Sequence, residues 1–380
     1  MKIICDENIP YGCEAFERLG DVRMMPGRAI DSAALRDAEL LIVRSITRVN
    51  DALLDGTAVR FVATATIGMD HLDIDCLRHR GIEWTSAPGC NADSVMNYIA
   101  SALLEWATAQ NRTLDGQTLA VIGCGNVGSR VARLGEALGM RVLRNDPPLA
   151  REQDGVYIPL DDALAQADIV TLHVPLTRTG QDPTFQLAND SFFERLKHGA
   201  LFINSSRGKV GSDEAILRAL EAGRISGAIL DVWETEPLVR PELHDAAFLA
   251  TPHIAGYSLE GKFNGTRMCF EAAARFLGVE AQWDLQLPPA NPECFELDCA
   301  AFTETEALRT AAQQIYAIRE DDRRMREALT SCNDEAQRPA AFDQLRKTYP
   351  VRREYSAARI ELKNPTRSLE GKLRALGFQI

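Results

Sequence analysis

One segment decides the fold of this chain: Leu119-Ala120-Val121-Ile122-Gly123-Cys124-Gly125-Asn126-Val127-Gly128. Its four apolar residues predict a buried strand, and the Gly-x-Gly-x-x-Gly spacing that follows them opens a helix. Gly123 permits a tight turn, Gly125 lets a diphosphate approach the backbone, and Gly128 lets helix and strand pack closely. The amides around Asn126 and Val127 then face the anion at the helix N-terminus. The segment therefore predicts a dinucleotide-binding unit.

The next apolar strand, Met140–Asn145, leads to Asp146, 18 residues after the last glycine, Gly128. A carboxylate at this place accepts hydrogen bonds from ribose hydroxyls and repels a 2′-phosphate. The sequence therefore predicts NAD rather than NADP as the cofactor. Arg144, two residues earlier, keeps NADP open as the alternative.

Apolar runs alternate with helical periodicity on both sides of this segment. Strands that are apolar on both faces and separated by helices are typical of parallel α/β sheets. The predicted fold is therefore α/β, with two Rossmann-like or flavodoxin-like lobes, a deep cleft and a small C-terminal α+β domain. The predicted strands are Lys2–Cys5, Leu40–Val43, Val59–Thr64, Leu119–Ile122, Arg141–Leu143, Ile169–His173, Ala200–Ile203, Ala228–Asp231 and Phe248–Ala250.

Two long helical patterns, Ala92–Thr108 and Leu259–Leu277, flank the second set of strands and predict that the chain crosses twice between lobes. The Pro-rich stretch 287–292 reads as an extended linker. The tail shows one helical stretch, Glu304–Leu329, and a strand-like segment, Glu354–Leu362. The expected domains are 1–91 with 257–285 as a substrate-binding lid, 92–256 as the NAD-binding domain, and 286–380.

Composition excludes several classes of protein. The 42 Lys and Arg against 54 Asp and Glu give a net charge of −12, which disfavours nucleic acid as a partner. No apolar run is long enough for a membrane span, and the N-terminus lacks the features of a signal peptide, so we expect a cytoplasmic protein with no membrane partner. The nine cysteines form no Cys-x-x-Cys pair, so we expect reduced thiols and no metal site.

Polar residues follow three predicted strands, in 204–208, 231–237 and 251–256. The carboxyl ends of parallel strands line the ligand crevice of an open α/β sheet, so these residues are expected to converge. Oxidation of an alcohol needs a base for the hydroxyl proton, and His253 suits that task at neutral pH. Glu236 is the candidate carboxylate that orients the imidazole. Arg207 can bind a substrate carboxylate through its planar fork, and Asp231 is expected near the nicotinamide carboxamide.

These motifs resemble the D-2-hydroxyacid dehydrogenase family over roughly residues 1–280. The resemblance is carried by Val121–Gly128, Ser205-Ser206-Arg207-Gly208, Leu230-Asp231-Val232, Glu236-Pro237 and Thr251-Pro252-His253-Ile254-Ala255. It implies that Arg207, Glu236 and His253 are catalytic and that NAD lies between two lobes. The residues expected to contact the cofactor are Gly123, Gly125, Asn126, Val127, Gly128, Asp146, Val174, Ser205, Ser206, Arg207, Asp231 and Gly256.

A closer resemblance, to family members that act on a phosphorylated four-carbon acid, covers essentially the whole chain. It is carried by Asp6–Pro10, Val43–Thr47, Thr64–His71, Ala87–Ala92 and Asp146-Pro147-Pro148, and by the C-terminal module. It implies oxidation of 4-phospho-D-erythronate at C2 to (R)-3-hydroxy-2-oxo-4-phosphobutanoate in pyridoxal 5′-phosphate biosynthesis, and a homodimer formed through the tail. One departure is Asn97, where such proteins usually carry a Glu.

Matching motifs place the substrate on Ser45, Thr66 and Tyr257. The hydroxyls and amides around Thr66 and Gly68 can bind carboxylate or phosphate oxygens, and Arg44 is a candidate partner of the phosphate. Helix capping is the structural alternative for Ser45 and Thr66. We interpret His71, His79, His198 and His244 as ordinary surface or turn residues. Arg346 and Lys347 are hypothesised to reach the phosphate site of a neighbouring subunit.

Two other functions remain open from the sequence. The first is a related dehydrogenase that acts on 3-phosphoglycerate or on an unphosphorylated hydroxy acid. Only the motifs of the N-terminal region and the C-terminal module argue against it. The second is a non-catalytic NAD-sensing regulator on the same fold. Retention of Arg207, Glu236 and His253 together favours an enzyme.

Overall fold

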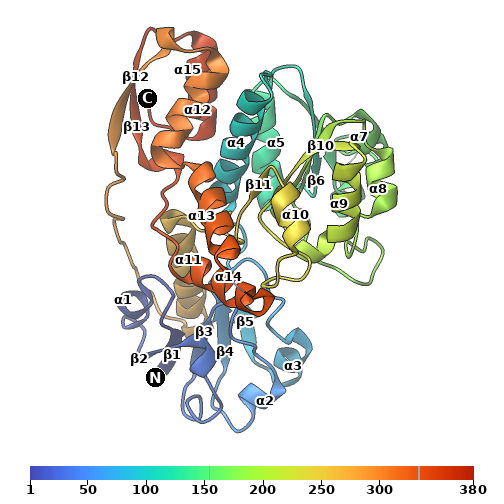
Figure 1. Cartoon of the computed structure of the whole chain (residues 1–380). Helices are drawn as coiled ribbons and strands as arrows, with labels where there is room; N and C mark the ends of the chain where they lie inside the picture. The colour runs from blue at the N-terminus through green and yellow to red at the C-terminus, as the bar shows by residue number, and fades with distance from the viewer. Residues whose placement is uncertain (154, 333) are drawn as a thin grey trace. The chain divides into compact units, whose positions relative to one another are not determined.

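The computed structural model describes residues 1–153, 155–332 and 334–380. The chain folds as two compact units (Figure 1). The first unit comprises Met1–Ala92 and Tyr257–Pro288, and the second comprises Asp93–Gly256 and Pro289–Ile380. Each unit is built around parallel β-structure, so the predicted α/β class is confirmed.

The first unit contains a parallel sheet with the strand order β2-β1-β3-β4-β5. Its strands are β1 (Lys2–Asp6), β2 (Asp21–Met25), β3 (Leu40–Val43), β4 (Phe61–Thr64) and β5 (Glu83–Thr85). This is the flavodoxin-like order, in which the connections reverse direction between β1 and β3. The carboxyl ends of these two strands therefore border the expected ligand crevice of the sheet.

Both faces of this sheet are buried because alternate residues of each strand point to opposite sides. Ile3 and Phe61 pack on one face with Phe16 of α1 (Gly12–Phe16) and Phe270 of α11 (Leu259–Leu277). On the other face, Ile4 and Val62 pack with side chains of α2 (Asp51–Leu54) and α3 (Ile74–His79). Covering both faces explains the continuous apolar runs of β3 and β4.

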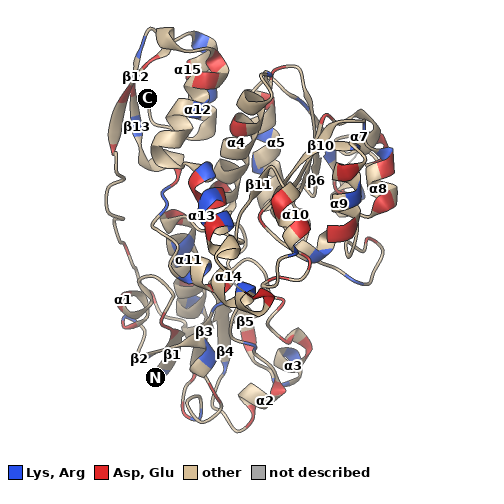
Figure 2. Ribbon diagram, viewed as in Figure 1, with Lys and Arg blue, Asp and Glu red and all other residues tan. Residues whose placement is uncertain are grey.

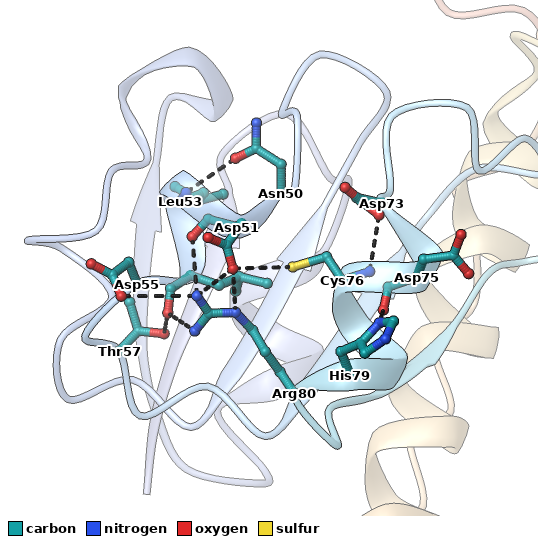
Figure 3. Close-up of polar contacts among 11 residues, drawn as sticks. Asn50, Asp51, Leu53, Asp55, Thr57, Asp73, Asp75, Cys76, His79 and Arg80 are labelled. Carbon is teal, nitrogen blue, oxygen red and sulfur yellow. Dashed lines mark hydrogen bonds and ion pairs between the residues drawn. The ribbon is translucent and has the colours of Figure 1, made fainter.

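Arg80 ties α2 to α3, the helices that follow the loops after β3 and β4 (Figure 3). Its Nε donates to Asp51 Oδ1 at 2.9 Å, and its Nη1 donates to the carbonyl of Leu54 at 3.1 Å. The two loops are also joined directly, since the amide of Val49 donates to His71 O at 2.9 Å and Asp73 N donates to Val49 O at 2.9 Å. The loop after β3 and the loop after β4 are therefore held side by side.

The second unit contains a parallel sheet with the order β11-β10-β9-β8-β6-β7. Its strands are β6 (Thr118–Ile122), β7 (Arg141–Asn145), β8 (Ile169–Leu172), β9 (Ala200–Asn204), β10 (Ile225–Leu230) and β11 (Leu249–Ala250). The helices between them are α5 (Asn126–Ala137), α6 (Pro147–Ala150), α7 (Leu160–Gln166), α8 (Asp190–Arg195), α9 (Asp213–Glu221) and α10 (Pro241–Ala246). The reversal of direction here falls between β6 and β8, beside the glycine-rich turn.

The C-terminal module, Pro289–Ile380, belongs to the second unit. It pairs β12 (Cys294–Asp298) with β13 (Arg359–Lys363) in parallel and carries α12 (Glu304–Ile315), α13 (Ile318–Thr330), α14 (Arg338–Lys347) and α15 (Arg367–Leu376). The long helix α4 (Ala92–Ala109) begins at the boundary between the units and continues in the second. Short 3-10 helices occur at Gly27–Ala29, Gly208–Val210, Cys299–Ala301, Glu335–Gln337 and Tyr355–Ala357.

The structure corrects the sequence-based prediction at several elements. The single helix predicted over 304–329 is two helices, because the backbone leaves the helical region at Tyr316 and Ala317. The predicted strand from Glu354 begins only at Arg359, after a 3-10 turn. Strands β2, β5 and β12 were missed because they lie at sheet edges and are only partly buried, so they carry no apolar run. In the described residues, no helix is both long and apolar enough to cross a membrane.

Candidate active site

The glycine-rich turn after β6 has the geometry that the fingerprint predicts. Gly123 adopts φ +87°, and a Cβ there would lie 2.7 Å from the carbonyl oxygen of His173. A Cβ on Gly128 would lie 1.8 Å from Gly123 O, so only glycine permits this packing of helix on turn. A Cβ on Gly125, in contrast, would meet no described atom within 4 Å. Space is therefore open directly beside the N-terminus of α5.

That N-terminus offers amides to an anion. Gly125 is the N-cap of α5, and no side chain caps the helix there. The first-turn amides of Asn126, Val127 and Gly128 belong to the backbone donors that an α-helix cannot satisfy internally. Open space and unsatisfied donors at one helix end suit a diphosphate.

Asp146 lies at the end of β7 with its carboxylate fixed by two amides. Cys124 N donates to Oδ2 at 2.8 Å, and Leu149 N donates to Oδ1 at 3.1 Å. Each oxygen keeps a further lone pair for a hydroxyl donor. Arg144, which kept NADP open, donates instead to Glu136 Oε1 at 2.7 Å. This arrangement favours a ribose with a free 2′-hydroxyl.

The segment after β9 holds Ser205, Ser206 and Arg207. Ser206 is anchored, since its amide and hydroxyl donate to Asn204 Oδ1 at 3.1 and 2.8 Å. Ser205 Oγ is buried and has no hydrogen-bond partner among the described residues, which leaves it available to a bound group. Arg207 Nη1 donates to Ser206 O at 2.8 Å. A Cβ on Gly208 would lie 1.8 Å from Trp233 O, so this segment packs directly against the segment that carries Glu236.

His253 and Glu236 form the pair that the sequence predicts. His253 Nδ1 lies 2.7 Å from Glu236 Oε1, and the other carboxylate oxygen accepts from Trp233 N at 3.2 Å. Burial favours the neutral acid, but the His253 ring, the Trp233 amide and Arg346 together outweigh it and lower the pKa of Glu236. The carboxylate is therefore ionised at neutral pH and accepts the Nδ1 proton of the imidazole, which leaves Nε2 as the proton acceptor.

The loop Thr251–Ala255, here called the His253 loop, has a constrained backbone. His253 adopts φ +58°, in the left-handed region that side chains rarely occupy. Asp231, fully buried at the end of β10, accepts from Ile254 N at 2.8 Å, Ala255 N at 2.9 Å and Thr251 Oγ1 at 2.7 Å. Sequence reasoning missed this role. Contact of Asp231 with a carboxamide stays a prediction.

The two remaining predicted cofactor residues, Val174 and Gly256, also lie in the second unit, after the end of a strand or loop. Val174 and Gly256 are half-buried and follow, respectively, the ends of β8 and of the His253 loop. His173 lies against Thr171 Oγ1 at 3.0 Å, and burial lowers its pKa to about 3, so its ring is neutral.

In the first unit, Arg44 and Ser45 follow β3, and Thr66 and Gly68 follow β4. Arg44 Nη1 donates to Asn8 O at 3.4 Å, across the point where the strand order reverses. Ser45 is exposed and caps no helix. Tyr257 lies under Lys262, whose Nζ is 4.8 Å from the ring centroid. The loops that carry Ser45 and Thr66 lie side by side, and their contact with a substrate stays a prediction.

Thr66 ends a hydrogen-bonded chain that begins at His71. Thr66 Oγ1 donates to Gly68 O at 3.0 Å, so its only proton is used there. Thr64 Oγ1, at 2.8 Å from Thr66 Oγ1, must therefore donate to it, and His71 Nε2 must donate to Thr64 at 2.9 Å. Burial outweighs the effect of Asp70 and lowers the pKa of His71 to about 4, so the neutral ring carries its proton on Nε2.

One interpretation of a single residue was wrong, that of His244. His71 lies in a turn, as interpreted, and also begins this chain of hydrogen bonds. His244 is buried, with Nδ1 2.9 Å from Asp245 Oδ1, rather than at the surface. Asn97, which replaces a Glu, is buried and accepts from Tyr355 N at 2.9 Å through Oδ1.

Comparison with known proteins identifies the family. A model described as the NAD binding domain of D-isomer specific 2-hydroxyacid dehydrogenases matches residues 98–255. An erythronate-4-phosphate dehydrogenase from Pseudomonas paraeruginosa is 43% identical over the full length of both chains. One from Salinibacter ruber is 46% identical and covers 93% of this chain and 92% of its own. The chain belongs to the erythronate-4-phosphate dehydrogenase family. It is accordingly an NAD-dependent oxidoreductase.

Solved structures agree with this assignment. A D-lactate dehydrogenase from Aquifex aeolicus, complexed with NAD and lactic acid, is 27% identical with a TM-score of 0.61, over 73% of this chain and 96% of its own. A formate dehydrogenase from Staphylococcus aureus in complex with NAD shares the fold at 20% identity and a TM-score of 0.61. A second family model, a domain of unknown function, matches residues 287–377.

The residues present fit NAD, the cofactor of this family. The diphosphate would lie in the open space at Gly125, and Asp146 would accept from the ribose. The unpartnered Ser205 hydroxyl is a further buried polar atom that a bound cofactor would satisfy.

Proposed function

We propose that this chain oxidises 4-phospho-D-erythronate at C2 to (R)-3-hydroxy-2-oxo-4-phosphobutanoate, a step of pyridoxal 5′-phosphate biosynthesis. The observation that carries the proposal is the 2.7 Å contact between His253 and the ionised Glu236 at the carboxyl edge of an NAD-binding sheet. Full-length similarity to erythronate-4-phosphate dehydrogenases supports the choice of substrate.

His253 is the general base in this proposal. The C2 hydroxyl gives its proton to His253 Nε2, the C2–O bond becomes a carbonyl, and the hydrogen on C2 leaves with its electron pair. Bound NAD supplies the acceptor for that hydride. Glu236 keeps the imidazole in the tautomer with Nδ1 protonated, and stabilises the imidazolium after proton transfer.

Arg207 binds the substrate carboxylate and polarises the oxygen on C2. A guanidinium suits this task because its planar fork matches a carboxylate and its charge is permanent. The close packing of Gly208 on Trp233 supports the assignment, because it places the Arg207 segment beside the segment of Glu236.

The loops of the first unit bind the rest of the substrate in this proposal. Ser45, Thr66 and the Gly68 backbone are the proposed contacts, with Arg44 near the phosphate and Tyr257 as a further contact. The Thr66 hydroxyl can turn its proton from Gly68 O to a substrate oxygen while it still accepts from Thr64. The acceptor side of Thr66 stays occupied, so the hydroxyl is directed to act as a donor.

The deciding assay measures reduced nicotinamide formed from NAD with 4-phospho-D-erythronate, 3-phospho-D-glycerate or D-lactate, each with and without a 2-oxo acid acceptor. Of the three acids, we expect only 4-phospho-D-erythronate to be oxidised. Dependence on the acceptor would mean that the reduced cofactor stays bound between turnovers. Preference for another acid would support the proposed oxidation but contradict the proposed substrate. Binding of NAD without turnover of any acid would favour a regulator.

The proposed assembly is a homodimer formed through the C-terminal module. Phe302 and Val351 of that module are 40% and 75% exposed, so each offers apolar surface that a second copy could cover. Light scattering on the eluted protein should give the mass of two chains. The mass of one chain would contradict the assembly and leave the reaction unaffected.

A further inference from the structure

The His253 loop is held at both ends by the C-terminal module. Before the loop, the amide of Ala250 donates to Asp322 Oδ1 at 2.8 Å. At its end, the carbonyl of Ala255 accepts from Arg352 Nη2 at 2.5 Å. Asp322 lies on α13, and Arg352 lies between α14 and β13. Two charged side chains from the module thus bracket the short segment that carries the proposed base.

Asp322 is itself fixed against the edge of the sheet. Its two carboxylate oxygens accept from Arg326 Nε at 3.0 and 3.1 Å. The other nitrogens of Arg326 donate to His244 O at 3.1 Å and Ala247 O at 2.8 Å, at the end of α10. Figure 1 shows α13 beside β11, and Figure 2 shows Lys or Arg alternating with Asp or Glu along α13. The carboxylate therefore meets Ala250 N from a rigid position.

Arg352 is buried, with 5% of its surface exposed. Besides Ala255 O, its Nη2 donates to Ser94 Oγ, and its guanidinium lies 4.3 Å from the ring centroid of Tyr316. Ser94 Oγ also donates to Ala255 O at 2.9 Å. A guanidinium that is removed from water needs such partners, and those of Nη2 fix its position, whereas Nη1 is buried with no hydrogen-bond partner among the described residues.

The region around Arg352 is anchored to α4 as well. Tyr355 N donates to Asn97 Oδ1 at 2.9 Å, and Tyr355 Oη lies 2.6 Å from Ser101 Oγ. Asn97 and Ser101 lie one turn apart on α4, as does Ser94 before them, so one face of this helix fixes the whole segment that carries Arg352. The unusual Asn97 thus has a structural role at this junction.

These contacts bear on catalysis because the His253 backbone is strained. A left-handed φ at a residue with a side chain persists only where its surroundings determine it. Asp231 accepts from the loop, and Trp233 Nε1 and Ser94 Oγ donate to the carbonyls of Thr251 and Ala255. Arg352 and Asp322 add one anchor from the C-terminal module at each end of the loop. Without them, the loop has fewer constraints to keep Nε2 of His253 directed at the substrate.

We propose that the C-terminal module is part of the catalytic centre, with Arg352 and Asp322 as positioning residues that set the orientation of His253 through the ends of its loop. This inference rests on the proposed function, which makes His253 the base. It assigns to the module a role within one chain, separate from the proposed contact between subunits. Neither residue exchanges a proton or touches the reacting atoms.

The test compares Arg352→Met and Asp322→Asn with Arg319→Gln in the full-length protein. Arg319 is the matched control, because it docks the same helix on Phe248, before β11, and does not touch the His253 loop. We expect kcat to fall about 10- to 100-fold in the first two variants, with the KM for NAD within about twofold of wild type. The deuterium isotope effect on kcat with C2-deuterated substrate should rise, because proton and hydride transfer become slow. Arg319→Gln should keep kcat near wild type.

A second readout does not need a substrate. The NMR signal of the His253 Nδ1 proton, assigned by its loss in His253→Gln, reports the hydrogen bond to Glu236 and should shift or broaden in Arg352→Met. Unchanged kcat and an unchanged signal in the two anchor variants would overturn the inference, as would an equal loss in Arg319→Gln. If Arg352→Met does not fold, Asp322→Asn alone decides. A wild type that oxidises no hydroxy acid contradicts the proposed function, and the NMR comparison then decides this inference by itself.

Discussion

Two histidines follow strand ends in the two units, and their surroundings give them different chemistry. His253 in the second unit faces a carboxylate at 2.7 Å. His71 in the first unit faces a threonine hydroxyl at 2.9 Å and is buried enough that its pKa lies at about 4. The first ring has an anionic partner, and the second has only a neutral one.

The difference teaches that partners, rather than residue type, separate a base from a positioning group. A carboxylate beside an imidazole favours proton uptake, whereas burial beside a hydroxyl keeps the ring neutral. The neutral ring of His71 can still orient Thr64 and Thr66 by donating one proton in a fixed direction. In the proposed function, His253 takes a proton during turnover, whereas His71 only directs a hydroxyl.

The largest effect is expected at His253. His253→Ala should lower kcat/KM about 10³- to 10⁴-fold, since a positioned general base contributes rate enhancements of this order. Binding of NAD, measured by fluorescence titration, should stay within about threefold of wild type. His71→Gln is the matched control and should lose less than tenfold. If His253→Ala kept as much as a tenth of the wild-type kcat, His253 would not be the general base.

A smaller effect is expected at Thr64, which links His71 to Thr66. Thr64→Val keeps the shape and removes the hydroxyl, so KM for the hydroxy acid should rise about fivefold, which corresponds to one hydrogen bond of about 1 kcal/mol. KM for NAD and kcat should change little. Thr64→Ser restores the hydroxyl and should restore KM. Equal KM values for the valine and serine variants would show that the chain of hydrogen bonds does not contribute to substrate binding.

The smallest effect concerns stability in acid. The unfolded chain protonates His71 near its ordinary pKa of 6.5, whereas the folded chain does so only near 4. The contribution of the neutral His71 ring to the free energy of unfolding is therefore fully present above pH 6.5 and is lost as the pH decreases toward 4. His71→Gln cannot take this proton, so its Tm should fall less between pH 7 and 4.5, by on the order of a few degrees.

The control for this measurement is His79→Gln, because His79 is an exposed histidine on α3 of the same unit. It should show the acid sensitivity of the wild type. Glu236 falls in a different pH window, since its pKa is lowered and the stability it adds is lost only below its ordinary value of 4.5. Identical melting curves for His71→Gln and His79→Gln at both pH values would contradict the burial of His71.

The sequence by itself determined the local features of this protein. Apolar runs predicted the central strands of both sheets, because strands buried on both faces must be apolar throughout. The glycine spacing predicted the turn after β6, because Gly123 and Gly128 leave no room for a Cβ. Arg207, Glu236 and His253 were predicted as catalytic because chemically useful residues followed predicted strand ends, and the structure shows His253 in contact with Glu236.

Only the tertiary structure decided which distant groups meet. Edge strands such as β2 and β5 carry no apolar run, so strand order and register came from packing. Nothing in the local pattern near Asp322 or Arg352 indicates that they meet Ala250 and Ala255, which lie 72 and 97 residues earlier in the chain. The physical reason is that periodicity reports which face of an element is buried, whereas a polar contact depends on where the folded chain brings a single donor to a single acceptor.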